Sequence, residues 1–188
     1  QYTYDHNGNM VRDEINKNYD AIYDYRNLLI YISSIRYEDA GDSKKATTYV
    51  TRYYYDEAGN RTRKMVFKSD ENEVDPPDWD NMTDVGKWIL VANEFYVRDA
   101  AGKEIADYTT NGLSFWNIYG SDNVGRINAD TTKQFYLNDH LGTTRAVVDA
   151  SNTLYASYDF DAWGYKLREW NSSDNAKYKF TGKERDIE

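Results

Sequence analysis

Short runs of tyrosine, threonine and branched aliphatic residues alternate along the chain with clusters of glycine, asparagine and aspartate. Two such runs, Thr48–Tyr55 and Arg61–Phe67, are separated by Asp56-Glu57-Ala58-Gly59-Asn60. Aromatic and β-branched side chains pack well on a pleated strand, whereas glycine tolerates the positive φ of a tight turn. The pattern therefore predicts two strands joined by a hairpin turn.

The same turn recurs along the sequence. The two closest copies are Tyr4-Asp5-His6-Asn7-Gly8-Asn9 and Tyr55-Asp56-Glu57-Ala58-Gly59-Asn60, and looser copies are Arg98-Asp99-Ala100-Ala101-Gly102-Lys103 and the dipeptides Tyr23-Asp24 and Tyr158-Asp159. One copy would indicate only an isolated hairpin, but repetition predicts a chain built from strand–turn–strand units. Because an aspartate side chain can bond the backbone two residues on, we interpret Asp5, Asp24, Asp56 and Asp159 as turn-forming residues.

The pattern divides the chain into four segments. Residues 1–69 are expected to form hairpin repeats, 70–86 an acidic surface insertion that holds both prolines, 87–133 further repeat strands, and 134–188 a segment with motifs of its own. We expect a polar loop at Glu38–Lys45 in the first segment. A short helix is expected within Pro77–Trp88, which begins in the second segment. The expected strands are Ala21–Tyr25, Leu28–Arg36, Thr47–Tyr55, Thr62–Lys68, Lys87–Val97, Glu104–Thr109, Leu113–Tyr119, Gln134–Leu137, Arg145–Val148, Leu154–Phe160 and Tyr165–Trp170.

Composition supports an all-β, antiparallel fold and excludes several kinds of function. The chain has 19 Tyr, 6 Phe and 5 Trp but only 2 Pro, and its net charge of −9 argues against binding to nucleic acid or to anionic membranes. No apolar run approaches the ~20 residues that span a bilayer. The absence of cysteine excludes thiol catalysis, disulfides and cysteine-ligated zinc. The 188 residues suit one domain or a segment of a larger one, and a start at Gln1 without Met indicates a processed product or a fragment.

Three ordered motifs in the second half carry a family resemblance. They are Asp139-His140-Leu141-Gly142-Thr143-Thr144-Arg145, then Tyr158-Asp159-Phe160-Asp161-Ala162-Trp163-Gly164, then Phe180-Thr181-Gly182-Lys183-Glu184-Arg185-Asp186. Together with the tyrosine–aspartate turns they resemble the repeat-associated core region of bacterial RHS/YD-repeat proteins. The segments Asn117-Ile118-Tyr119-Gly120-Ser121 and Val124-Gly125-Arg126 are also similar to the run before these motifs in Bacteroidetes-like members.

The resemblance implies a fold and a location. In that family the repeats wind as a curved, spiralling antiparallel sheet, and in toxin-type members the sheet forms a shell around a C-terminal polypeptide, on the outside of a bacterium or secreted from it. Trp163, in the second motif, is expected to pack. The family's next motif, where self-cleavage residues lie, does not follow Glu188 in this sequence. The residues expected to have a structural role are Tyr4, Asp5, Gly8, Asn9, Tyr55, Asp56, Gly59, Asn60, Asp139, His140, Leu141, Gly142, Arg145, Trp163, Gly164, Gly182, Arg185 and Asp186.

Several residues could in principle carry chemistry, and a structural role is favoured for each. Asp139 and His140 could form an oriented base, but a turn in which they bond backbone is the preferred interpretation. Asp5, Asn7 and Asn9 have the one, three, five spacing of a calcium loop without its remaining ligands. The acidic run from Asp70 to Asp80 offers hard oxygens but suits a solvated loop. Carboxylate pairs suited to glycoside hydrolysis cannot be singled out.

These observations favour a non-enzymatic scaffold that needs no cofactor or metal. Its partners would be flanking repeats or other copies of itself at open sheet edges, and an enclosed polypeptide cargo. One alternative is the subunit of an extracellular filament or tube that adds end to end through those edges. Another is a carbohydrate-binding surface module, in which Trp79, Trp88, Trp116, Trp163 and Trp170 would stack on sugars; cross-strand packing is the alternative role for those rings.

Overall fold

The computed structural model describes residues 1–40, 43–69, 88–171, 177 and 179–182. The acidic insertion 70–86 and almost all of the expected helix therefore lie outside the described residues, as do the motif residues Arg185 and Asp186. None of the described residues forms a helix with the length and apolar character that a bilayer crossing requires.

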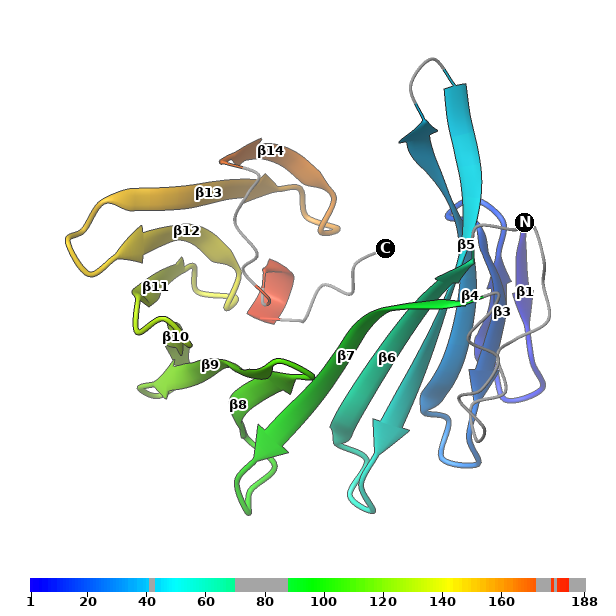
Figure 1. Ribbon diagram of the computed structural model, residues 1–188, viewed down its shortest axis with the longest axis horizontal. Helices are drawn as coiled ribbons and strands as arrows, with labels where there is room; N and C mark the ends of the chain where they lie inside the picture. The colour runs from blue at the N-terminus through cyan, green and yellow to red at the C-terminus, as the bar shows by residue number, and fades with distance from the viewer. Residues whose placement is uncertain (41–42, 70–87, 172–176, 178, 183–188) are drawn as a thin grey trace. The chain divides into compact units, whose positions relative to one another are not determined.

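The prediction of an all-β, antiparallel fold is confirmed: the strands follow one another in the sheet in the order of the sequence (Figure 1). The strands are β1 (Tyr2–Tyr4), β2 (Met10–Asp13), β3 (Asn18–Tyr23), β4 (Leu29–Ala40), β5 (Ser43–Tyr55), β6 (Arg61–Ser69), β7 (Ile89–Arg98), β8 (Glu104–Thr109), β9 (Gly112–Tyr119), β10 (Asn123–Asn128), β11 (Lys133–Asn138), β12 (Thr144–Asp149), β13 (Leu154–Phe160) and β14 (Lys166–Trp170). A 3-10 turn, η1 (Phe180–Gly182), follows them.

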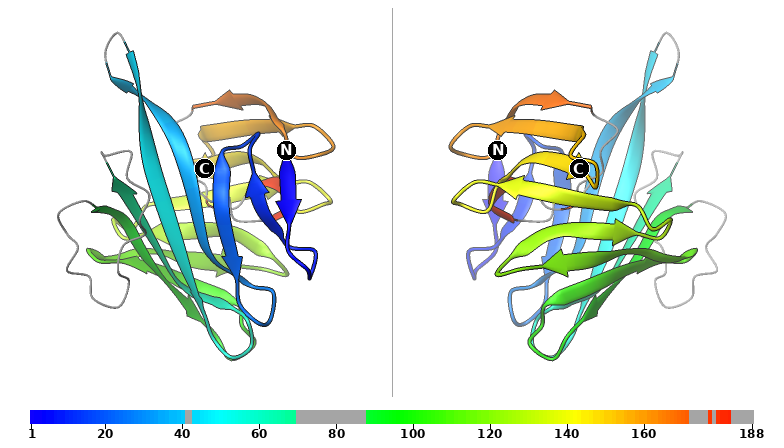
Figure 2. Two further views of the ribbon diagram at one scale, coloured as in Figure 1. Left: turned by 90° about the vertical axis from the view of Figure 1, so that its right-hand side faces the viewer. Right: turned by 90° about the vertical axis from the view of Figure 1, so that its left-hand side faces the viewer.

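The chain forms two compact units. The first comprises Gln1–Val97 with Thr109–Asn111, and the second Arg98–Tyr108 with Gly112–Glu188. The second unit is a series of successive hairpins, as the two views of Figure 2 show for β9 to β13. Each unit has its own small apolar cluster: Val50, Met65, Phe67 and Trp88 in the first, and Tyr136, Val147, Ala156 and Tyr158 in the second.

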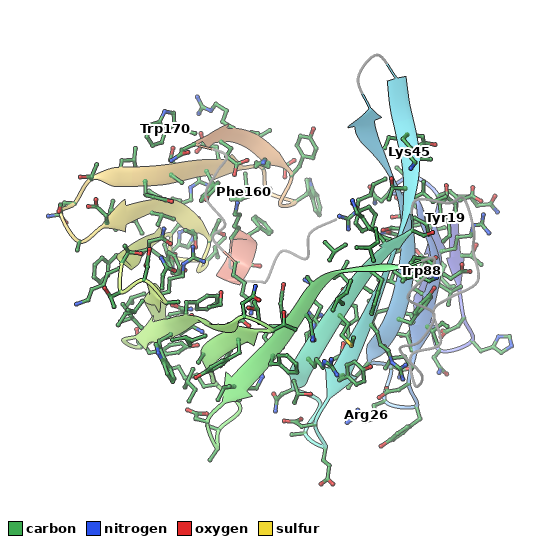
Figure 3. All side chains as sticks on the ribbon, in the orientation of Figure 1. Tyr19, Arg26, Lys45, Trp88, Phe160 and Trp170 are labelled. Atoms are coloured by element: carbon green, nitrogen blue, oxygen red, sulfur yellow. The ribbon has the colours of Figure 1, made fainter. Side chains whose placement is uncertain are left out.

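Long side chains bury one another along the sheet surface. In the first unit the Arg36 guanidinium lies 4.2 Å from the centre of the Tyr49 ring, and that of Arg61 lies 4.1 Å from the Tyr53 ring. Both tyrosines are buried. Side chains project from both faces of the strands in Figure 3. Cation–π pairs of this kind contribute about 0.5–1 kcal/mol at exposed sites and more when desolvated. The high tyrosine content therefore supplies lateral packing to the sheet.

The expected loop at Glu38–Lys45 is wrong. Strands β4 and β5 continue through most of it, and their register pairs Tyr37 with Ala46 and Glu38 with Lys45. A β-ladder is made by backbone groups, so a polar sequence does not by itself end it. Polar side chains indicate exposure to solvent more directly than they indicate the end of a strand.

Candidate functional site

In the part of the chain that the structure describes, seven turns that begin with aspartate share one hydrogen-bonding pattern, which we call the Asp turn. The first residue is aspartate: its amide donates to the carbonyl four residues on, and its carbonyl accepts from the amide three residues on. The residue three positions after the aspartate always has positive φ. The turns begin at Asp5, Asp24, Asp56, Asp99, Asp139, Asp149 and Asp161, and the positive-φ residues are Gly8, Asn27, Gly59, Gly102, Gly142, Asn152 and Gly164.

The aspartate side chain fixes each turn. In the turn at Asp139, carboxylate Oδ1 accepts the amides of Leu141 and Thr143, each at 3.0 Å. At Asp5, Oδ1 accepts the amides of Asn7 and Asn9 at 2.9 and 2.8 Å. A backbone that must turn sharply thus has its donors satisfied locally. The interpretation of Asp5, Asp24 and Asp56 as turn-forming residues is confirmed.

The carboxylates of these turns are electrostatically stabilised. Hydrogen bonds from the Asn9 side chain and from nearby amides lower the pKa of Asp5 below its ordinary value of 3.8. For Asp139, burial tends to raise the pKa, but the amides of Thr143 and Leu141, together with nearby charge such as that of Arg145, act against burial and the pKa is lowered. Donation to the ionised form is the general cause of such a shift. These groups are therefore held as anions for structural use.

Asp159 is not a turn residue, which corrects the sequence interpretation. It lies within β13, where its carboxylate pairs with Arg145 at 2.9 Å and with Arg168 at 2.7 Å. The turn that ends β13 begins two residues later at Asp161. The spacing of aspartate and Gly164 would have indicated Asp161, because the positive-φ residue comes three positions after the aspartate in every Asp turn.

The tyrosine that precedes the aspartate has its own role, which the sequence analysis missed. At the end of β5 the Tyr55 hydroxyl donates to the Leu29 carbonyl at 2.7 Å, and at the end of β3 the Tyr23 hydroxyl donates to the Met10 carbonyl at 3.0 Å. In both cases the acceptor is the first residue of the neighbouring strand. The tyrosine thus ties the end of one strand to the start of the strand beside it. Burial raises the pKa of Tyr23, which keeps its hydroxyl a donor.

Neighbouring turns of the first unit are also joined. The Arg26 guanidinium, in the turn at Asp24, donates to the Asp56 carbonyl of the next turn at 2.7 Å. On the other side, the Asn27 side-chain oxygen accepts the side-chain amides of Asn7 and Asn9 at 3.2 and 2.9 Å. Three successive turns therefore form one connected rim.

The second unit brings its three motifs together at a C-terminal clasp, by which we mean Lys177 with residues 179–182. The clasp adds no strand to the sheet; η1 lies against β12 (Figure 1). The Lys179 carbonyl accepts the Thr144 amide at 2.8 Å, and the Thr181 amide donates to Thr143 Oγ1 at 3.0 Å. The Asp139 motif thus supplies one backbone and one side-chain partner for the backbone of the clasp.

The second motif supplies an apolar contact for the clasp. The Phe180 ring lies 5.7 Å from the Phe160 ring, measured between centroids. It also lies over Gly164, where an added Cβ would come within 2.7 Å of the Phe180 ring. Glycine is therefore required at 164 both for its φ of 88° and for the room that Phe180 needs. Trp163, by contrast, is 91% exposed, so the expectation that it packs is wrong.

Charged side chains tie the clasp to the sheet at both ends. Lys177 Nζ lies 3.0 Å from Glu104 Oε1 and 2.7 Å from Asp107 Oδ2, both on β8. Lys179 Nζ lies 3.3 Å from Glu169 on β14. Burial tends to raise the pKa of Glu169, but hydrogen bonds from Lys166 and Lys179 outweigh it and the pKa is lowered. The clasp thus reaches from the first strand of the second unit to its last.

A cavity of about 600 Å³ lies beside the Asp139 turn. Its polar walls already bond one another: Tyr119 donates to the Glu104 carbonyl at 2.6 Å, and Asn138 donates to the Asn123 carbonyl at 3.3 Å. The exposed His140 also lines it. Because the Asp139 carboxylate accepts turn amides, the structural interpretation is favoured over an oriented base for Asp139.

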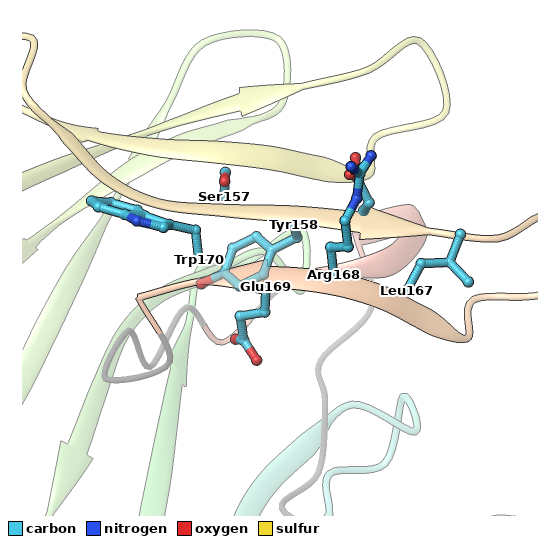
Figure 4. A pocket seen from close by; sticks show the side chains of 7 residues that line it. Ser157, Tyr158, Leu167, Arg168, Glu169 and Trp170 are labelled. Atoms are coloured by element: carbon cyan, nitrogen blue, oxygen red, sulfur yellow. Dashed lines mark ion pairs between the residues drawn. The ribbon is translucent and has the colours of Figure 1, made fainter.

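A second hollow, also about 600 Å³, lies along β13 and β14 (Figure 4). Trp170 and Leu167 give it exposed apolar surface, and Arg168 pairs there with Asp159. The exposed rings near this edge include Trp163, Tyr165 and Trp170. Among the described residues, no group of three or more histidines or acids is arranged to hold a metal ion.

The remaining motif residues lie in the strands and turns that the repeats predict. Tyr4 ends β1 and is exposed, and Asn60 closes its turn by donating to Asp56. Leu141 is exposed at the tip of the Asp139 turn, whereas Arg145 lies in β12. Gly182 has a φ of 65° at the end of the clasp.

No protein-family model matches the chain. Two curated proteins match it over its whole length: the tRNA3(Ser)-specific nuclease WapA of Bacillus spizizenii, 28% identical, and the tRNA nuclease WapA of Bacillus subtilis strain 168, 27% identical. The chain spans 8% of the length of each of these relatives. It is therefore similar to a small part of much longer proteins.

Solved structures give a weaker likeness. A Photorhabdus luminescens Tc holotoxin pore with a mutated TccC3 matches all of this chain and 14% of its own, at 13% identity and a TM-score of 0.36. A TcdB2-TccC3-TEV crystal structure matches equally, at 12% identity and a TM-score of 0.36. At this TM-score the likeness carries no structural argument.

Proposed function

We propose that the chain is a non-enzymatic β-scaffold segment of an RHS/YD-repeat protein, found on the surface of a bacterium or secreted from it. In a longer parent it forms part of a wall that encloses or presents a C-terminal toxin or effector. The observation that carries the proposal is the Asp turn, which occurs seven times among the described residues with one hydrogen-bonding pattern. Such a unit adds strands in sequence order, which is what extension of a wall needs.

The motifs that resemble the family support the same function. They converge on the clasp through hydrogen bonds and close packing, and their glycines are at positions where φ is positive. Their polar side chains make contacts that hold the fold: carboxylates accept hydrogen bonds from backbone amides, and lysines pair with buried acids. Flanking repeats at the sheet edges and an enclosed polypeptide are the partners that this function implies.

The relatives support the view that the scaffold and any catalytic activity lie in different parts of such a protein. Both are named as tRNA nucleases, and this chain corresponds to 8% of their length. We assign the present segment to the scaffold and any catalytic activity to other parts of such a protein. The negative net charge fits this assignment, because binding to tRNA needs a basic face.

Protease protection tests the proposal. A longer polypeptide that contains this chain and the sequence following it would be treated with protease, and survival of the following sequence measured by mass spectrometry. Protection compared with the same sequence expressed alone supports the wall. A matched variant with Asp56→Ala and Asp99→Ala, which removes two turn acceptors, is expected to lose protection. Equal digestion of the enclosed and free sequences would overturn the proposal.

One observation favours a second candidate, an assembling subunit. Strands β1 and β14 each have a single neighbour in the sheet order of the described residues, so each leaves an edge able to pair. Light scattering over a concentration series distinguishes the two: growth of large particles favours a filament or tube, and a constant monomer mass favours the wall segment.

A third candidate, a carbohydrate-binding module, rests on the exposed side chains of Trp163 and Trp170. Binding to a glycan array that both tryptophan-to-alanine variants abolish would support it.

A further inference from the structure

Lys177, Asp107 and Glu104 form a compact group inside the second unit. Lys177 Nζ lies 2.7 Å from Asp107 Oδ2 and 3.0 Å from Glu104 Oε1. All three side chains are nearly shielded from water, at 9%, 5% and 6% exposure respectively. The Phe115 ring, 5.6 Å from Nζ, forms part of the surroundings. An amine is thus held beside a carboxyl group, with a second carboxyl group in contact with the same amine.

The group has the components of an amide-forming reaction. Nζ contacts an oxygen that is bonded directly to Asp107 Cγ, so the amine is held next to the carboxyl carbon that it would attack. Glu104 contacts Nζ from another side, so it can accept and return a proton. Shielding from water favours loss of water over the reverse reaction.

Charge balance points in the same direction. Arg98 Nη2 lies 3.2 Å from Glu104 Oε2, so a second cation borders the group. Buried ions are costly even when they are paired. Condensation of Lys177 with Asp107 would convert one cation and one anion into a neutral amide, and it would leave Arg98 and Glu104 paired with each other.

We propose that Lys177 and Asp107 form an intramolecular isopeptide bond, with Glu104 as the proton relay. Glu104 takes a proton from the Lys177 ammonium group, and Nζ attacks Asp107 Cγ. The C–N bond forms, one Cγ–O bond breaks, and the leaving oxygen departs as water with two of the three ammonium hydrogens. Ammonium plus carboxylate gives amide plus water, so no oxidant or other reactant is needed. In a chain without cysteine, this bond closes the loop from β8 to the clasp covalently.

Mass spectrometry of the full chain tests the bond. After purification, incubation and denaturation, the intact mass is expected to be lower than the sequence mass by one water molecule. Trypsin should then yield one species in which the peptide Glu104–Arg126 is joined to the peptide Glu169–Lys179, because a modified Lys177 is no longer cleaved. Fragmentation should place the link between Asp107 and Lys177.

Matched variants define the roles. Lys177→Arg keeps the positive charge but has no condensing amine, and it should retain the full sequence mass. Glu104→Gln keeps both reacting groups and removes the relay, so the cross-linked fraction should fall at least tenfold. Lys179→Arg changes the neighbouring lysine and should leave the cross-link complete. A full sequence mass for the folded native chain overturns the proposal, as does a water loss confined to a single tryptic peptide.

Discussion

At the scale of single residues, glycines with the same backbone conformation have different reasons to be glycine. Gly8 has a φ of 85° and Gly164 a φ of 88°. A Cβ added at Gly8 would meet nothing within 4 Å, whereas one at Gly164 would come within 2.7 Å of the Phe180 ring. The first glycine is needed only for its conformation, and the second also for space.

This contrast predicts the effects of two alanine substitutions. Gly8→Ala should lower the free energy of unfolding by about 1–2 kcal/mol through backbone strain. Gly164→Ala carries the same strain and should lose roughly a further 1–3 kcal/mol because Phe180 must move. Urea denaturation of the two variants checks the difference, and equal losses would show that Phe180 does not pack on Gly164.

The repeated tyrosine gives a second prediction at this scale. Tyr55→Phe removes the hydroxyl that donates to the Leu29 carbonyl and should lower the free energy of unfolding by about 0.5–1.5 kcal/mol. Tyr25→Phe is the control, because Tyr25 is 91% exposed. The same denaturation measurement should show almost no change for Tyr25→Phe. An equal loss in both variants would remove the assigned role of Tyr55.

At the scale of elements, the hairpin is held by an ionised side chain, which makes its stability depend on pH. The pKa values of Asp5, Asp24 and Asp139 are lowered in the folded chain. A group with a lowered folded pKa stabilises the fold fully above its unfolded pKa, and this contribution is lost as pH falls through the folded pKa.

The contribution of the turn aspartates to the free energy of unfolding should therefore be constant near neutral pH. It should fall as the pH drops below 3.8, the ordinary aspartate pKa. Asp139→Asn keeps a side-chain oxygen for the amides of Leu141 and Thr143 but cannot ionise. Denaturation midpoints at a series of pH values should fall less steeply for this variant than for the native chain below pH 3.8. Parallel curves would mean that the Asp139 charge does not contribute.

At this scale, some strands and turns could be predicted from the sequence and others could not. Strands flanking a glycine-containing turn were predicted because period, propensity and turn chemistry agreed, as around Asp56. The turns at Asp149 and Asp161 were not predicted, because neither aspartate follows a tyrosine; an aspartate with Gly or Asn three residues later is the better signal. The contact of Lys177 with Asp107 joins positions 70 residues apart, and no local pattern contains it.

At the scale of the whole molecule, the fold consists of two units, each with a small apolar cluster, and their strands follow the sequence order. Among the described residues, elements mostly contact their neighbours in the sequence order, and the clasp adds contacts to β8 and β12 in the second unit. A stack of nearest-neighbour units can be extended by adding more of them. This property underlies our proposal that the chain is part of a longer wall.

Electron cryo-microscopy of a longer protein that contains this chain tests the central claim most directly. The account predicts that β1 and β14 continue, by backbone pairing, into the sheet of flanking repeats, and that the polypeptide after the clasp lies enclosed by that sheet. A map in which this chain forms a separate domain on a linker, with the following polypeptide outside it, would contradict the account.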